Sequence, residues 1–122
     1  MFDHVSLKVA DFSKSLAFYR AALAPLGFVP QHVDEAGKSA GFGPKGEVGL
    51  WIAEGKPRSN AHLAFESPDR AAVARFYEAA LGAGGKDNGK PGLRADYGPN
   101  YYAAFAIDPD GNNVEAVTLV AK

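Results

Sequence analysis

The sequence contains an internal duplication. A shift of 58 residues aligns residues 4–27 with residues 62–85, and eight of these 24 positions are identical. Chance would give about two identities, because Ala, Gly and Leu are common residues. The identical pairs are His4/His62, Asp11/Asp69, Phe18/Phe76, Tyr19/Tyr77, Ala21/Ala79, Ala22/Ala80, Leu23/Leu81 and Gly27/Gly85. Two copies are too few for a solenoid, so we expect two half-domains, neither of which can bury its apolar face alone.

Each copy begins with a strand pattern followed by a helix pattern. Residues 4–9 and 61–66 alternate between apolar and polar, as in a half-buried strand. The first helix is predicted after Asp11 as N-cap and ends before Pro25 and Gly27. The second is predicted with Ser67 as N-cap, Pro68 in the first turn and Gly82 at its end.

Three short strand candidates follow each helix. They are Val29–Val33, Ser39–Phe42 and Val48–Ala53 in the first copy, and Leu93–Tyr97, Tyr101–Ile107 and Asn113–Val120 in the second. The order strand, helix and three strands, written twice, predicts an α+β fold of two βαβββ modules related by a pseudo-twofold axis. We expect one domain over residues 1–122, with module 1 at about 1–54, a linker at 55–60 and module 2 at about 61–122.

Composition excludes several classes of function. The chain has no cysteine, so disulfide scaffolds, thiol nucleophiles and cysteine-based metal centres are ruled out. Its 13 basic and 14 acidic residues give a net charge of −1 without a basic cluster, which argues against nucleic acid and membrane surfaces as partners. Residues 1–10 do not resemble a signal peptide and no apolar run reaches the length of a membrane span, so a soluble, cytoplasmic protein is expected.

Three side chains are candidate metal ligands. His4 and His62 occupy equivalent positions in the two copies, and the strand alternation places both opposite the helix-facing residues. Glu115 lies within an otherwise apolar strand, where a carboxylate is costly to bury unless it is paired or bound to a cation. Imidazole and carboxylate are ordinary ligands for a divalent metal. The alternatives are hydrogen-bonded histidines and a solvent-facing Glu115.

The order and spacing of these motifs resemble the vicinal oxygen chelate superfamily, which includes glyoxalases, bleomycin-resistance proteins and extradiol dioxygenases. The resemblance rests on a histidine at the start of each copy and on Asp108-Pro109-Asp110-Gly111 with Glu115 four residues later. It covers nearly the whole chain. It implies paired βαβββ modules whose mixed sheets curl around an open cup that holds a metal.

The resemblance also implies roles for individual residues. One divalent ion (Fe, Mn, Ni, Co or Zn) would be held by His4, His62 and Glu115. The fourth ligand position of the family falls on Leu50, counted four residues after Gly46 as Glu115 is counted after Gly111, and leucine cannot bind a metal. Tyr101 or Tyr102 would donate a hydrogen bond to a developing oxyanion, and core packing is the alternative for both. The expected substrate pocket is lined by Leu50, Trp51, Tyr97 and Arg94, although Arg94 could instead be solvated.

The implied function is that of a metal-dependent enzyme, a lyase, isomerase or dioxygenase, acting on a small molecule with two neighbouring oxygens. The alternative is a non-catalytic protein that sequesters a drug or another small molecule in the same cup. A homodimer is expected. The cup would be built either within one chain or by modules of two chains, in which case His4 of one chain would join His62 and Glu115 of the other.

Overall fold

Two βαβββ modules follow one another along the chain, as the duplication predicts. The computed structural model describes residues 1–122. Module 1 contains β1 (Val5–Val9), α1 (Phe12–Leu23), a 3₁₀ turn (Ala24–Leu26), β2 (Val29–Asp34), β3 (Ser39–Gly43) and β4 (Leu50–Glu54). Module 2 contains β5 (His62–Glu66), α2 (Arg70–Gly82), β6 (Lys86–Leu93), β7 (Tyr102–Ile107) and β8 (Asn113–Thr118). Neither α1 nor α2 has the length and apolar character that a membrane-spanning helix requires.

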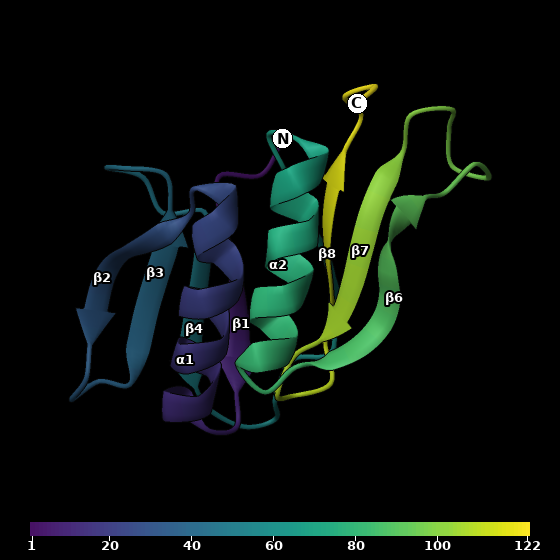
Figure 1. The fold of residues 1–122 in the computed structure, drawn as a ribbon. Helices are drawn as coiled ribbons and strands as arrows, with labels where there is room; N and C mark the ends of the chain where they lie inside the picture. The colour runs from purple at the N-terminus through teal and green to yellow at the C-terminus, as the bar shows by residue number, and fades with distance from the viewer.

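The two modules form open four-stranded sheets with the same topology. The strand orders are β1-β4-β3-β2 and β5-β8-β7-β6. In each sheet the first and last strands of the module are parallel and the remaining pairs are antiparallel. Figure 1 shows the sheets side by side, with α1 and α2 packed against each other in front of them. The fold is therefore α+β with mixed sheets.

The apolar face of each sheet packs against the helices. In β1, Leu7 and Val9 are buried, whereas Ser6 and Lys8 are exposed on the opposite face. One continuous core joins the two modules, so that neither buries its apolar face alone. The largest buried side chains of the helices are Phe12, Leu16, Phe18, Tyr19, Leu23, Val73 and Phe76. The candidate site lies on the other face of the second sheet, away from the helices.

The helix starts differ in one respect from the prediction. Asp11 caps α1 as expected, and its carboxylate accepts from the backbone N–H of Lys14 at 3.1 Å. The prediction that Ser67 caps α2 is wrong, because Asp69 is the cap and accepts from Ala72 N at 2.8 Å. Ser67 is instead buried, and its backbone N–H donates to Val117 at the end of β8. Two aspartates at equivalent positions of the duplication thus start both helices.

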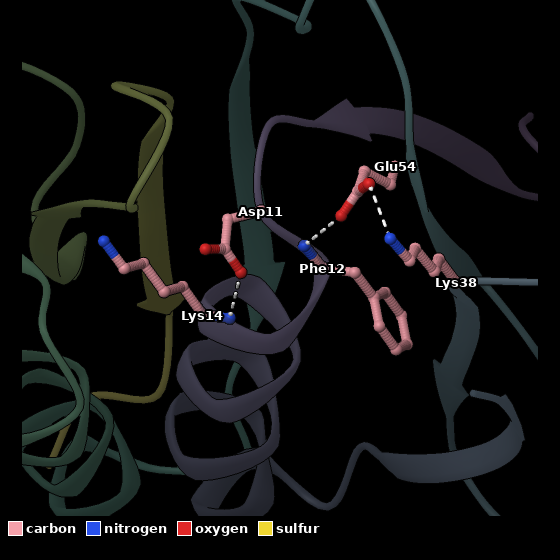
Figure 2. A network of polar contacts seen from close by, with 5 residues as sticks. All are labelled: Asp11, Phe12, Lys14, Lys38 and Glu54. Atoms are coloured by element: carbon pink, nitrogen blue, oxygen red, sulfur yellow. Dashed lines mark hydrogen bonds and ion pairs between the residues drawn. The ribbon is translucent and has the colours of Figure 1, made fainter. Parts of the chain in front are cut away.

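A second carboxylate from the end of β4 also caps α1. Figure 2 shows Glu54 between two donors: its Oε2 accepts from the backbone N–H of Phe12 at 3.0 Å, and its Oε1 pairs with Lys38 Nζ at 3.2 Å. The hydrogen bond from Phe12, followed by that from Lys38, lowers the pKa of the Glu54 carboxyl below its ordinary value. The role of Glu54 is therefore to join β4 to the start of α1.

The position of β6 was predicted wrongly. The strand covers Lys86–Leu93, whereas most of the expected segment Leu93–Tyr97 forms a turn. The strand contains two glycines and a proline, and its register with β7 shifts twice around Gly89. Glycine and proline are tolerated here because β6 is an edge strand that pairs with β7 alone.

Candidate functional site

His62 and Glu115 meet on the face of the second sheet that the helices leave uncovered. The parallel register of β5 and β8 places Glu115 beside Ala64, two residues after His62 on the same face. His62 Nε2 lies 3.0 Å from Glu115 Oε1. The glutamate side chain is only 3% exposed, whereas the histidine is 50% exposed. The structure therefore holds a buried carboxylate beneath an accessible imidazole.

Both oxygens of the Glu115 carboxylate have partners. Oε2 accepts a very short hydrogen bond from the Tyr101 hydroxyl. Burial, together with this bond and the charge of Glu115, raises the pKa of Tyr101 to about 12. Tyr101 therefore keeps its proton and remains a donor at neutral pH.

The two tyrosines proposed as donors lie on opposite sides of the sheet. Tyr101 reaches the Glu115 carboxylate. The ring of Tyr97 packs edge to face against the ring of Tyr101, with centroids 5.2 Å apart. Tyr102 instead packs against the hydrophobic core, beneath the guanidinium of Arg70 at 4.9 Å. The expectation that Tyr102 reaches the site is therefore corrected, and Tyr101 is the residue in position.

An open hollow of about 510 Å³ surrounds the pair. Its lining consists of His62, Tyr97, Tyr101, Phe105, Asn113 and Glu115. The rings of His62 and Phe105 stack at 6.3 Å with an angle of 22° between their planes. The guanidinium carbon of Arg94 lies over the Phe105 ring, 5.4 Å from its centroid. The two Nη atoms of Arg94 donate to the backbone carbonyls of Gly92 and Lys90. Arg94 thus lies next to Phe105 without being one of the lining residues, and each of its Nη atoms already donates one hydrogen bond.

The turn between β7 and β8 positions the two partners. Asp108 is buried and accepts from two backbone N–H groups of its own turn, from Asn112 Nδ2 and from the Tyr19 hydroxyl on α1. Asn112 Oδ1 in turn accepts from Ala61 N at 2.7 Å, directly before His62. Every buried side-chain polar atom in the structure has a partner. This turn therefore fixes the starts of β5 and β8, and with them the imidazole and the carboxylate.

His4 does not join this cluster within the chain. Its Nδ1 bonds to Asp3 Oδ1 at 2.7 Å, and its side chain is 50% exposed. No group of three histidine or carboxylate side chains in the chain is arranged to hold a metal ion. The structure thus brings together two of the three predicted ligands, His62 and Glu115.

The strand register corrects the predicted fourth ligand position. In module 1, Ser6 pairs with Trp51, and in module 2 its duplicate Ala64 pairs with Glu115. Trp51, not Leu50, is therefore the counterpart of Glu115. Leu50 is 4% exposed and belongs to the core. The prediction counted four residues from Gly46, as Glu115 lies four residues after Gly111. The count was one residue too short, because Trp51 lies five residues after Gly46.

Sequence reasoning missed three residues of the site. Phe105 and Asn113 line the hollow, and Asn113 O lies 3.0 Å from His62 Nδ1. Asp108 organises the turn. The Asp-Pro-Asp-Gly motif was a signal for Asp108, whereas the parity of β7 with Glu115 could have identified Phe105, which faces it in the register.

Comparisons with known proteins agree with this fold. The sequence model of the Glyoxalase/Bleomycin resistance protein/Dioxygenase superfamily matches residues 1–116. A glyoxalase/bleomycin resistance protein from Albidiferax ferrireducens has 27% identity and a TM-score of 0.81, over 97% of this chain and 98% of that one. The fosfomycin resistance protein FosX from Listeria monocytogenes shares the fold at 19% identity and a TM-score of 0.71, over 97% and 92% of the two chains. No curated protein is significantly similar in sequence. The chain belongs to the Glyoxalase/Bleomycin resistance protein/Dioxygenase superfamily.

Proposed function

We propose that the protein is a metal-dependent enzyme acting on a small molecule with two neighbouring oxygens. The observation that carries this proposal is the pair formed by His62 and the buried Glu115 at the base of an open hollow. Members of the superfamily typically bind a divalent metal and small-molecule ligands, and they often form dimers. When bound, such a metal supplies Lewis-acid stabilisation of negative charge on a chelated oxygen.

The donor atoms of the pair fit a metal ion. Two ligands about 2.1 Å from one ion and about 90° apart lie about 3.0 Å from each other. The distance between His62 Nε2 and Glu115 Oε1 is 3.0 Å. His62 Nδ1 faces the carbonyl of Asn113, which is the usual outer partner of a metal-binding imidazole. A neutral imidazole has one N–H, which can donate either to the Asn113 carbonyl or to Glu115 Oε1. If it donates to the carbonyl, a cation bound between Nε2 and Oε1 would be the partner of the carboxylate oxygen.

The third ligand would come from a second copy of the chain. Two protein ligands are fewer than the three that catalytic metal sites commonly have. His4 is accessible on the uncovered face of the other module, and no further histidine or carboxylate of the same chain joins the pair. We therefore place His4 of one copy opposite His62 and Glu115 of another, in a homodimer with two equivalent sites.

The remaining side chains of the hollow would orient and polarise the substrate. The Tyr101 hydroxyl keeps its proton and donates a hydrogen bond to Glu115 Oε2, so its role would be to orient the carboxylate as a metal ligand. It would stabilise negative charge on a substrate oxygen only by exchanging this hydrogen bond for one to the substrate. Tyr97 and Phe105 would offer aromatic surface to the substrate, since both line the hollow. Which of lyase, isomerase or dioxygenase chemistry follows depends on the metal and the substrate.

Metal content is the first test. Elemental analysis of untagged protein should find close to one divalent ion per chain, and His62→Ala should lose it while keeping the native circular dichroism spectrum. Leu93→Ala, an exposed change in the edge strand β6, is the matched control and should retain the metal. A native chain that stays metal-free after incubation with Fe, Mn, Ni, Co and Zn salts would refute the proposal. The non-catalytic ligand-binding function would then replace it.

Subunit mixing tests whether the site is shared between copies. His4→Ala and His62→Ala should each be metal-free, but in a mixed dimer one of the two sites receives both native histidines. Random exchange makes half of the dimers mixed, so about a quarter of all sites should recover metal. If each chain built its own site, no mixture would recover any.

A further inference from the structure

We propose that a second hollow, where the turn between β7 and β8 meets α1 and the end of α2, binds a small anion of the diphosphate class. This hollow has a volume of about 650 Å³, and its lining includes three basic side chains, Lys14, Arg58 and Lys86. It shares no lining residue with the hollow that contains His62 and Glu115. Binding here would therefore not depend on the metal site.

The three basic side chains come from three separate segments of the chain. Lys14 lies in α1, Arg58 lies between β4 and β5, and Lys86 begins β6. None of the three forms an ion pair in the structure. Figure 2 shows the Lys14 side chain extended, with its ammonium group clear of the nearby Asp11 carboxylate. Their positive charges are therefore available to an anion that enters the hollow.

Backbone hydrogen bonds hold the segments that carry two of these cations. Ser59, directly after Arg58, donates its N–H to the Lys8 carbonyl at 2.9 Å, and its Oγ accepts from Lys8 N at 2.8 Å. Gly85, directly before Lys86, donates its N–H to a carbonyl of α2 at 2.8 Å. The backbone at both cations is thus set before a ligand arrives, so binding has to order only the side chains.

The acidic residues of the lining are engaged elsewhere. Asp108 and Asp110 are buried, and the Asp108 carboxylate is held by its own turn and by Tyr19. Asp110 Oδ1 accepts from Ala10 N at 2.9 Å, and its Oδ2 accepts from Ser15 Oγ at 3.3 Å. Three basic and two acidic residues leave the lining with a net charge of +1, in a chain whose net charge is −1. The electrostatic field at the hollow therefore favours an anion.

The duplication shows that the fold does not require a positive charge at this place. Under the shift of 58 residues, Gly84 and Lys86 correspond to Leu26 and Phe28. Leu26 and Phe28 line a different hollow, of about 800 Å³, together with apolar residues that follow β8. The same position is therefore apolar in one module and basic in the other. Packing alone explains Phe28, whereas Lys86 is exposed and points to a ligand.

The arrangement of the cations indicates the class of anion. The guanidinium of Arg58 can form two parallel hydrogen bonds to one phosphate group, and each lysine contributes a point charge. Inorganic pyrophosphate carries about three negative charges at neutral pH, which matches three unpaired cations. The lining contains no aromatic ring on which a base could stack. We therefore expect the site to recognise the linked phosphates and not a nucleoside attached to them.

Calorimetry with inorganic pyrophosphate tests the proposal. Pyrophosphate should bind the wild type at least about fivefold more tightly than orthophosphate, and ADP should bind no more tightly than pyrophosphate. Lys14→Met, Arg58→Met and Lys86→Met should each weaken pyrophosphate binding by about twofold to fivefold, and the triple variant by at least about twentyfold. Lys45→Met removes an exposed lysine outside the hollow and is the matched control, with an expected change of less than about twofold.

Two further measurements make the result specific to this hollow. Pyrophosphate also binds metal ions, so the titration is repeated on His62→Ala, in which affinity should be unchanged. Lys86→Arg, which keeps the charge, should retain binding, and thermal melts confirm that each variant is folded. Absence of saturable binding to the wild type would overturn the proposal, as would full affinity in the triple variant. Loss of binding in His62→Ala would place the pyrophosphate at the metal and equally overturn it.

Discussion

Removing the Tyr19 hydroxyl tests whether the turn that carries the site is held by its buried hydrogen bonds. Tyr19 is fully buried on α1, and its hydroxyl donates to Asp108 Oδ2 at 2.5 Å. Burial, followed by the charge of Asp108, holds the pKa of Tyr19 well above its ordinary value, so the donor is neutral at physiological pH. In Tyr19→Phe, Oδ2 keeps only the bond from Asn112 Nδ2 at 2.8 Å.

The expected loss is about 2 kcal/mol of the free energy of unfolding, because hydrogen bonds to charged groups contribute about 1.5–3 kcal/mol. A chain of 122 residues unfolds with an entropy of about 0.26 kcal/mol/K. The midpoint of thermal unfolding should therefore fall by about 8 °C. Differential scanning calorimetry at one fixed protein concentration measures it, since an oligomer makes the midpoint depend on concentration.

The second copy of the duplication supplies a matched control. Tyr77 aligns with Tyr19 and interacts with Asp87, but that pair is at the surface. Tyr77→Phe should leave the unfolding midpoint nearly unchanged, because exposed polar pairs contribute little. If Tyr19→Phe shifts the midpoint no more than Tyr77→Phe does, the buried bond is not what stabilises the turn. At alkaline pH the wild type should lose stability above pH 10, where the unfolded tyrosine ionises and Tyr19 does not, and Tyr19→Phe should lose less.

Two further changes have definite expected results. Glu54→Gln should lower the unfolding midpoint at pH 7. Because the pKa of Glu54 is lowered in the folded state, the wild-type protein should be more stable than the variant above pH 4.5, and this difference in stability should vanish as the pH falls through the folded pKa. Thermal melts across this pH range measure the difference. A difference that persisted in acid would contradict the capping role. Gly41→Ala should destabilise the fold and shift Trp51 fluorescence, because the new Cβ collides with the indole. Gly46→Ala, at a positive φ but in open space, is a control: its melting point should change while its fluorescence should not.

The sequence was sufficient for the module architecture because that architecture follows from local patterns and from the duplication. The alternation in β1 and β5 identified the face that carries His62, and Asp11 identified the start of α1. Eight shared positions predicted two equivalent modules. These features depend on the period of a strand, the chemistry of a helix N-terminus and repetition, all of which can be read along one chain.

Features that depend on pairing between distant strands could not be read in this way. The edge position of β6 permits a glycine- and proline-rich strand at Lys86–Leu93, which has no local strand signal. The register of β4 makes Trp51, and not Leu50, the counterpart of Glu115, because a shift of one residue turns every side chain to the opposite face.

The candidate site likewise combines features that the sequence determined with features that only the tertiary structure determined. The sequence by itself determined the residue types, His62 and Glu115, and the motif that precedes the carboxylate. Only the tertiary structure decided that the parallel pairing of β5 with β8 brings these two side chains to 3.0 Å, and that His4 remains apart. The physical reason is that a ligand set is a property of how sheets are placed in space, and that placement is set by packing of the shared core rather than by any local pattern.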